Sequence, residues 1–119
     1  MNIETFREYC LAKPGVTEEF PFDETTLVFK VGGKMFALTD LEGDFIIALK
    51  CNPEYSIELQ ERYSAITPAY HMSKVHWIDV NEATSFDEKL LMQLIDGSYE
   101  LVFKGLTKKG KDQISSMNN

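Results

Sequence analysis

The chain has 119 residues, of which 44% are hydrophobic, and this length and apolar content predict one globular domain that spans residues 1–119. Its formal net charge of −7 at pH 7 opposes the binding of phosphate-rich partners, and all of the excess acid lies in residues 1–61. No apolar run is long enough to cross a bilayer and the charged N-terminal segment does not resemble a signal peptide, so we predict a cytoplasmic protein without a membrane partner.

The first predicted element is a helix in IETFREYCLA, residues 3–12. Phe6 and Cys10 recur at a spacing that places them on one helical face. Asn2 is suited to cap the N-terminus of this helix, and the Lys-Pro-Gly sequence at residues 13–15 stops it.

A β-hairpin is predicted in TTLVFKVGGKMFALT, residues 25–39, where two β-rich runs flank Gly32 and Gly33. Two consecutive glycines can take the positive φ values of a tight two-residue turn. The register that this turn predicts pairs Val31 with Lys34, Phe29 with Phe36, and Leu27 with Leu38. It places Leu27, Phe29, Val31, Phe36 and Leu38 on one apolar face, and Thr26, Lys30 and Thr39 on the other.

A third strand and a second helix are predicted next. The alternation in DFIIALK, residues 44–50, places Phe45, Ile47 and Leu49 on the inward side. Asn52 is a helix cap followed by proline at the first helical position, and a helix that ends before Pro68 follows.

One more strand is predicted in HWIDV, residues 76–80. Alternation places Ile78 and Val80 on one side of this strand, and Trp77 and Asp79 on the other. The loops between the earlier strands are too short for crossover connections, so the sheet is antiparallel there.

The last predicted element is a longer helix over residues 86–105. Ser85 and Glu88 form a capping box at its start, and Gly97 weakens its middle. Its inward residues are Leu91, Leu94, Ile95 and Val102. The tail after about residue 106 is expected to fray.

The predicted order of elements is helix, three or four antiparallel strands, helix, strand and helix. Strands with one apolar and one mixed face need cover on one side only. The sequence therefore predicts the α+β class, as a two-layer sandwich in which an antiparallel β-sheet has helices packed on one face. The other face of the sheet is left open to solvent or to a partner.

Five segments of the chain carry a family pattern: PGVTEEFPF, TLVFKVGGKMFAL, LKCNPE, PAYHMSKVHW and SYELVFKGLTKK. In this order and spacing, over about residues 3–109, they resemble the MmcQ/YjbR family of small bacterial proteins. The resemblance implies a CyaY-like, or frataxin-like, two-layer α+β fold. It also implies DNA binding, which is the common label of that family. The chain departs from the family pattern at Asp23, Ser73 and Val75, and the valine stands where a lysine is expected.

Both histidines and the single tryptophan of the chain fall within YHMSKVHW, residues 70–77. This stretch interleaves rings with cationic or titratable groups, a composition that suits stacking on bases or on planar ligands. We predict that the loop turns these side chains outward and that Lys30, on the mixed face of the hairpin, extends the patch. The candidate binding residues are Tyr70, His71, Lys74, His76, Trp77 and Lys30.

Two non-enzymatic functions fit this patch. The first is nucleic-acid (DNA) binding, which the family resemblance and a run of lysines near the C-terminus favour. The second is the binding of a small planar ligand or of a protein partner. The lysine run comprises Lys104, Lys108, Lys109 and Lys111.

The residues give less support to a zinc site or to catalysis. A zinc site takes at least three protein ligands, so the two histidines would need Asp79 or Cys51 as a further ligand. Cys51 could act as a nucleophile with a histidine base, although a lone buried cysteine is usually a small hydrophobe, and we expect both cysteines to be reduced. Trp77 can also serve only to seal the sheet edge beside the loop. We therefore predict no metal, no cofactor and no enzymatic activity.

Overall fold

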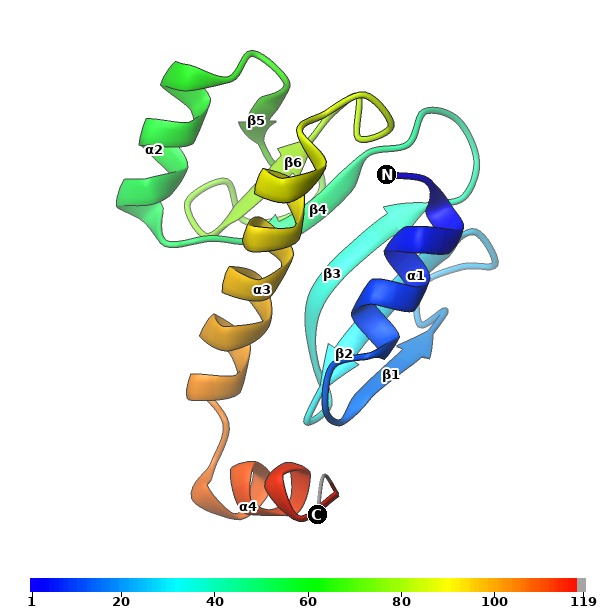
Figure 1. Ribbon diagram of the computed structural model, residues 1–119, viewed down its shortest axis with the longest axis vertical. Helices are drawn as coiled ribbons and strands as arrows, with labels where there is room; N and C mark the ends of the chain where they lie inside the picture. The colour runs from blue at the N-terminus through cyan, green and yellow to red at the C-terminus, as the bar shows by residue number, and fades with distance from the viewer. Residues whose placement is uncertain (118–119) are drawn as a thin grey trace.

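The computed structural model of the protein describes residues 1–117, which form one six-stranded sheet and four helices (Figure 1). The helices are α1 (Ile3–Leu11), α2 (Pro53–Arg62), α3 (Glu88–Lys104) and α4 (Lys108–Met117). The strands are β1 (Val16–Glu19), β2 (Thr26–Val31), β3 (Lys34–Asp40), β4 (Ile47–Lys50), β5 (Ile66–Pro68) and β6 (Trp77–Val80). Neighbouring strands are antiparallel, in the order β1-β2-β3-β4-β6-β5.

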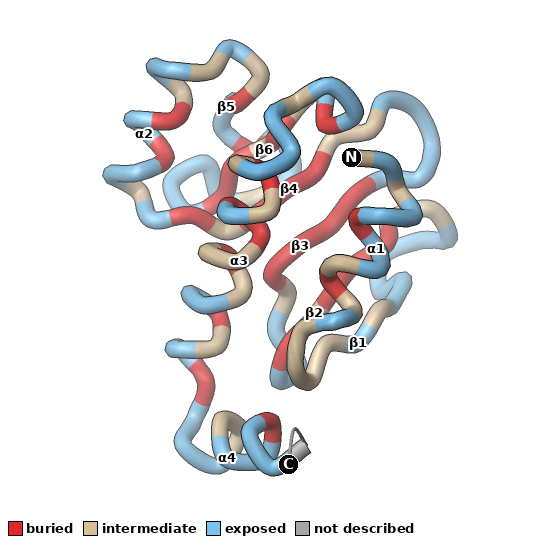
Figure 2. Tube along the Cα trace, in the orientation of Figure 1, coloured by how far each residue is buried: buried red, intermediate tan, exposed pale blue. Residues whose placement is uncertain are grey.

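The helices α1 and α3 cover one face of the sheet, and α2 packs beside the edge strand β5 (Figure 1). Buried residues concentrate in the central strands and on the inner sides of α1 and α3, whereas α4 is mostly exposed (Figure 2). The predicted two-layer α+β arrangement with an antiparallel sheet is confirmed. Among residues 1–117, no helix has the length and apolar character that crossing a membrane requires.

Asparagine caps set the start of the first two helices. Asn2 Oδ1 accepts a hydrogen bond from Thr5 N at 2.7 Å and caps α1. Asn52 Oδ1 accepts one from Glu54 N at 2.9 Å, and Pro53 occupies the first turn of α2. Both predicted caps are confirmed.

The start of α3 differs from the predicted capping box. The cap is Asp87, whose carboxylate accepts a hydrogen bond from Leu90 N at 3.2 Å. The hydroxyl of Ser85 instead donates to Glu82 O at 3.3 Å in the preceding turn. The predicted Ser85 cap is therefore wrong, because a carboxylate two residues later satisfies the free N–H groups of the helix.

The turn between β2 and β3 is the predicted glycine turn. Gly32 and Gly33 have φ values of 58° and 80°. Val31 lies opposite Lys34, as predicted. Two successive positive φ values match the twist of an antiparallel hairpin, so the two glycines close it without strain.

A β-bulge then changes the predicted register. Past the bulge, Phe29 lies opposite Ala37 and Val28 lies opposite Leu38, so the predicted pairs of Phe29 with Phe36 and of Leu27 with Leu38 are wrong. The extra residue turns Leu38 to the face away from the helices. Thr39 moves to the helix-covered face, where its buried hydroxyl donates to Ile46 O at 2.7 Å.

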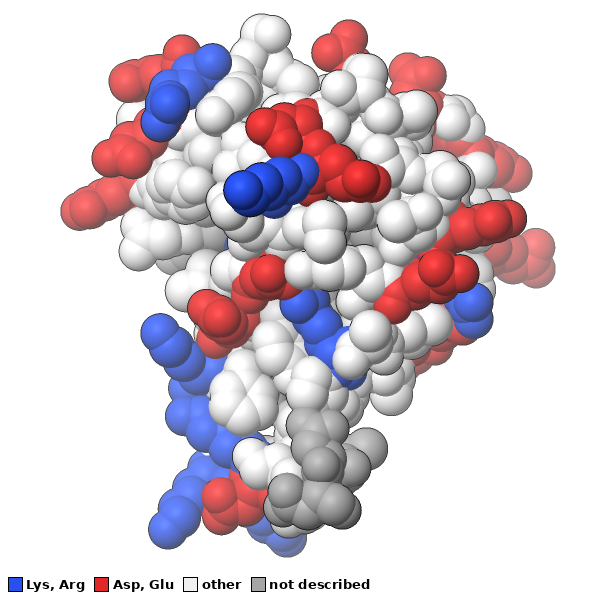
Figure 3. Space-filling view, in the orientation of Figure 1, with Lys and Arg blue, Asp and Glu red and all other residues white. Residues whose placement is uncertain are grey.

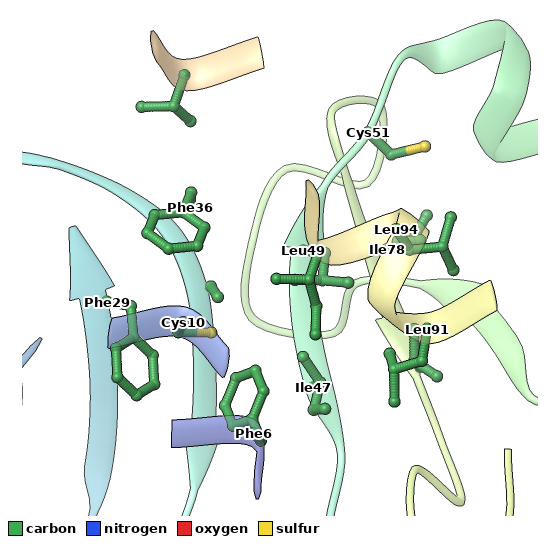
Figure 4. Packing of buried hydrophobic residues seen from close by; sticks show 14 of the residues in the cluster. Phe6, Cys10, Phe29, Phe36, Ile47, Leu49, Cys51, Ile78, Leu91 and Leu94 are labelled. Atoms are coloured by element: carbon green, nitrogen blue, oxygen red, sulfur yellow. The ribbon is translucent and has the colours of Figure 1, made fainter. Parts of the chain in front are cut away.

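The helix-covered face of the sheet carries the main core. The rings of Phe6 and Phe29 meet edge to face with their centroids 5.3 Å apart. Figure 4 shows Phe6, Phe29 and Phe36 on one side of Leu49, and side chains of α3 on the other. The core includes the predicted inward residues Ile47, Leu49, Ile78, Val80, Leu91, Leu94, Ile95 and Val102.

One buried serine connects α3 to the sheet. The hydroxyl of Ser98 donates a hydrogen bond to Phe36 O and accepts one from Lys50 N at 2.9 Å. Phe36 is the residue that the bulge leaves without a partner in β2, and Lys50 is the last residue of β4. Ser98 therefore satisfies backbone groups where the strand ladder is interrupted.

The chain beyond residue 106 is not frayed as expected, because α4 packs against the body of the protein. Leu106 and Ile114 are buried, each over a glycine. A Cβ atom at Gly15 would lie 2.9 Å from Ile114 Cγ1, and one at Gly32 would lie 2.7 Å from Leu106 Cδ1. These close approaches anchor α4. Residues 118–119 of the expected frayed tail lie outside the described residues.

Candidate functional site

The sheet face away from α1 and α3 holds a groove with a volume of about 800 Å³. Leu38, Ala48 and Asp79 are successive neighbours across β3, β4 and β6 and line this groove. Strand alternation directs these side chains away from the helices. Three connections also contribute to the lining: the turn around Phe22, the loop between β3 and β4, and the loop over residues 69–76.

The loop over residues 69–76 joins β5 to β6 and is closed by its own hydrogen bonds. Ala69 N donates to Trp77 O at 3.3 Å, and Trp77 N donates to Ser73 O at 2.9 Å. Lys74 Nζ donates to Ala69 O at 2.9 Å. These bonds fix the shape of the loop beside the groove.

Three of the predicted site residues come together on this loop. Tyr70 is 77% exposed, and its ring meets the His71 ring edge to face with centroids 4.5 Å apart. Lys74 Nζ lies 5.8 Å from the centroid of the Tyr70 ring. Tyr70 and His71 line the groove. The outward orientation is confirmed for these three side chains, and their binding role stays a prediction.

Trp77 is placed differently from the prediction, whereas His76 faces outward as predicted but lies outside the groove. Trp77 is only 7% exposed, so the prediction that its ring faces outward is wrong. Alternation does place it on the open sheet face, but there it is buried in a cluster with Leu38 and Ala69, against which Met72 of the loop packs. His76 is exposed and is not part of the groove lining.

Lys30 lies on the open face of the hairpin but is engaged with an acid. Its Nζ is 3.3 Å from Glu19 Oε1 on the neighbouring strand β1. It is not part of the groove lining. Lys30 therefore adds no free positive charge to the residues around Tyr70.

Carboxylates dominate the charge of the groove. Those that line it are Asp23, Asp40, Glu42, Asp44 and Asp79. Among the described residues of the lining, none is Lys or Arg, and the one titratable base is His71. A groove with this composition attracts cations and repels phosphate groups.

Asp79 is the carboxylate in the floor of the groove. Burial raises its pKa, and a hydrogen bond from Tyr70 N at 3.1 Å and the nearby positive charges of His71 and Lys74 oppose that rise. Because Asp79 is partly removed from water, a cation placed beside it is screened less than one at an exposed acid.

None of the five groove carboxylates was among the predicted binding residues, and Asp79 was considered only as a possible zinc ligand. Asp23 shapes its turn by accepting hydrogen bonds from Thr25 N at 2.9 Å and Thr26 N at 2.6 Å. The acidic run at residues 40–44 is visible in the sequence, but its position across the groove from residues 70–72 follows from the strand order β3-β4-β6. Sequence spacing alone does not give that order.

The geometry gives little support to a zinc site or to catalysis by Cys51. Burial raises the pKa of the Cys51 thiol to about 11 and that of the Cys10 thiol to about 12, so both are protonated at neutral pH. Both side chains lie in the core on the helix-covered face. In the part of the chain that the structure describes, no three or more His, Cys, Asp and Glu side chains are arranged to hold a metal ion.

The fold and the groove define a class of small α+β protein with helices on one face of the sheet and a ligand-sized groove on the other. The family model described as YjbR matches residues 11–101. The chain belongs to this family, and the resemblance seen in the sequence is confirmed.

Relatives in two Escherichia coli strains are similar over most of their length. YbdF of Escherichia coli O157:H7 is 40% identical over 112 residues, which cover 93% of this chain and 92% of that protein. YjbR of Escherichia coli K12 is 31% identical over 101 residues, with 84% and 86% covered.

Two solved structures are similar to this fold. A crystal structure of Deinococcus radiodurans protein DR2400 matches with a TM-score of 0.89 and 39% identity, over 96% of this chain and 88% of that chain. A Pseudomonas syringae protein matches with a TM-score of 0.72 and 29% identity, over 85% of this chain and 98% of that chain.

Proposed function

We propose that this protein is a non-enzymatic binding module whose open-face groove takes a small, planar, positively charged ligand. The observation that carries the proposal is the composition of the groove lining. Carboxylates accompany exposed aromatic rings there, and none of the described residues that line the groove is Lys or Arg. The volume of about 800 Å³ lies within the roughly 300–1,000 Å³ of small-molecule sites.

Each part of the lining has a role in this proposal. Phe22 and Tyr70 offer exposed ring faces on which a planar ligand can stack. The face of Tyr70 also attracts a cation by its quadrupole. Asp79, half-buried in the floor, supplies the charge that such a ligand would neutralise.

The groove favours this ligand over nucleic acid. Its carboxylates oppose a phosphate backbone, whose binding depends on the release of counterions by free lysines and arginines. Lys30 is paired with Glu19, and Lys74 donates to a backbone carbonyl. The densest group of basic side chains in Figure 3 lies at the end of the molecule formed by α4, away from the candidate loop.

Benzamidine is a planar cation that tests this proposal, and benzamide is its neutral isostere. We expect benzamidine to bind with a Kd on the order of 1 mM and benzamide to bind at least about tenfold more weakly. Asp79→Asn should weaken benzamidine about tenfold, because it removes the charge and keeps an acceptor for Tyr70 N. Trp77 fluorescence is a suitable readout, since Trp77 belongs to the same buried cluster as Leu38 and Ala48 of the groove floor.

Glu58→Gln is the matched control, because it removes one negative charge from an exposed position on α2 that is not part of the groove lining. It should leave benzamidine affinity unchanged. Equal binding of benzamide and benzamidine would contradict the proposal. A duplex oligonucleotide that displaces benzamidine, with affinity that falls steeply with salt, would replace it with the nucleic-acid hypothesis.

Lowering the pH is expected to weaken benzamidine binding. Protonation of Asp79 removes the charge that attracts the ligand, and because burial raises its pKa, this loss begins at a higher pH than for an exposed aspartate, whose pKa is about 3.9. Titrations across a pH series should show this fall in affinity. In Asp79→Asn, the part of the fall that comes from protonation of Asp79 should be absent. Binding that strengthens in acid would argue against a cationic ligand.

A further inference from the structure

A second cavity lies on the opposite side of the sheet from the groove. It is formed where the start of α2 meets the C-terminal half of α3, and its volume is about 220 Å³. Its buried lining includes Cys51, Ile78 and Leu94. Ile78 and its neighbour Asp79 face opposite sides of β6, so the cavity and the groove are separate. The volume is below that of sites for drug-sized ligands, roughly 300–1,000 Å³, and restricts the occupant to a smaller molecule.

Gly97 of α3 keeps this cavity open. It lies in the interior of a helix, where glycine is destabilising relative to alanine. Its φ is not positive, and a Cβ built on it meets no atom within 4 Å. Neither backbone conformation nor close packing therefore requires glycine here. The consequence of having no side chain at this position is free space at the wall of the cavity.

Apolar side chains remain exposed at the mouth of the cavity. Tyr55 of α2 is 42% exposed and Leu101 of α3 is 37% exposed, and both line the cavity. Large apolar side chains around an opening with an apolar interior are typical of a ligand site. The occupant that fits this lining has an apolar body.

The charges at the cavity favour an anion. Lys50 and Lys104 both line it, and the one carboxylate among the described lining residues is that of Glu100, which is exposed. The N-terminal turn of α2 is also present in the lining, through Asn52 and Tyr55, and it presents the positive end of the helix dipole. This charge balance is opposite to that of the groove.

We propose that this cavity binds a small carboxylic acid anion with an apolar body, such as an aromatic or branched aliphatic carboxylate. The apolar body occupies the space beside Gly97, over Cys51 and Leu94. The carboxylate lies at the rim, where Lys50 and Lys104 neutralise it. Binding is non-covalent, and the Cys51 side chain acts as an apolar contact.

Benzoate tests this site, with benzamide and benzamidine as neutral and cationic molecules of the same shape. In ¹H–¹⁵N spectra of the full chain, we expect benzoate to shift amide signals of residues 50–55 and 97–104, with a Kd on the order of 1 mM. Benzamide should bind this cavity at least about fivefold more weakly. Equal binding of benzamide and benzoate, or no benzoate shifts at about 50 mM, would overturn the proposal.

Substitutions at Gly97 separate occupancy of the cavity from other effects. Gly97→Leu fills the space and should weaken benzoate at least about tenfold, whereas Gly97→Ala should keep the affinity within about threefold and raise Tm. Lys104→Met should weaken benzoate severalfold, and Lys89→Met, which changes the same charge elsewhere on α3, should not. Unchanged benzoate affinity in a folded Gly97→Leu protein would overturn the proposal.

The proposals for the groove and for the cavity can be tested independently. Benzamidine binding that depends on Asp79 should persist in Gly97→Leu, because Gly97 does not line the groove. Benzoate binding should persist in Asp79→Asn. Loss of both ligands in either variant would show that the two sites are not separate and would overturn the assignment of benzoate to the cavity.

Discussion

Replacing Phe29 with alanine is expected to lower the free energy of unfolding by about 3–5 kcal/mol. Phe29 is fully buried on the helix-covered face of the sheet, and its ring meets that of Phe6 edge to face at 5.3 Å. Removing the ring creates a cavity between α1 and the sheet and forfeits this aromatic contact. Urea denaturation followed by circular dichroism measures the loss.

Phe22→Ala is the matched control for this prediction. Phe22 is 61% exposed on the open side of the protein, so its removal should change the free energy of unfolding by no more than about 0.5 kcal/mol. It lines the groove, however, and its loss should weaken benzamidine. Similar destabilisation by both substitutions would show that Phe29 does not have the structural role given to it here.

Ser98→Ala is expected to lower the free energy of unfolding by about 2–4 kcal/mol. The hydroxyl of Ser98 satisfies Phe36 O at the bulge and Lys50 N at the end of β4, and its loss leaves two backbone groups without this partner. An unsatisfied buried polar group costs about 1–3 kcal/mol. The loss should appear in denaturant titrations without a change in helix content.

Ser56→Ala separates the backbone bonds from the effect of removing any buried serine. Ser56 is also a buried helical residue, but its hydroxyl accepts from the side-chain amide of Gln60 at 2.9 Å, which can turn elsewhere. The gain in helix propensity is the same in both variants. Ser56→Ala should therefore lower the free energy of unfolding by less than about 1 kcal/mol. An equal loss in Ser98→Ala would contradict the role of the Ser98 hydroxyl at the bulge.

Long periodic segments made most of the fold predictable. The Asn2 and Asn52 caps, the turn at Gly32 and Gly33, and the inward face of α3 all follow from local sequence signals that agree with the global fold. The bulge was not predictable, because the hydrophobic pattern of β3 does not say where an extra residue lies.

Short or weakly patterned elements needed the tertiary structure. The strands β1 and β5 have four and three residues, too few to establish a period. The helix α4 contains a glycine and few apolar residues, and it is held by contacts of Leu106 and Ile114 with distant glycines. Tertiary contacts of this kind override local propensity.

The candidate site was predictable in part. The loop around Tyr70 was recognised because its composition is unusual, and exposure of its ring follows from its place in a connection between strands. The burial of Trp77 depends on the path by which the loop folds back on the sheet. The acidic partners across the groove depend on the order of the strands, which brings residues 40–44 near residues 70–72.

Side chains alternate along the four residues of β4, so this strand contributes both to the core and to the floor of the groove. Ile47 and Leu49 point to the core, while Ala48 between them lies in the floor of the groove. Ala48 and its neighbour Leu38 on β3 are buried with Trp77, whereas Asp79 on β6 is partly exposed to the groove, so a change at Asp79 can alter the charge of the groove with the least disturbance of the interior. Under the proposed function, ligand preference can therefore change at this position while the helix-covered core stays the same.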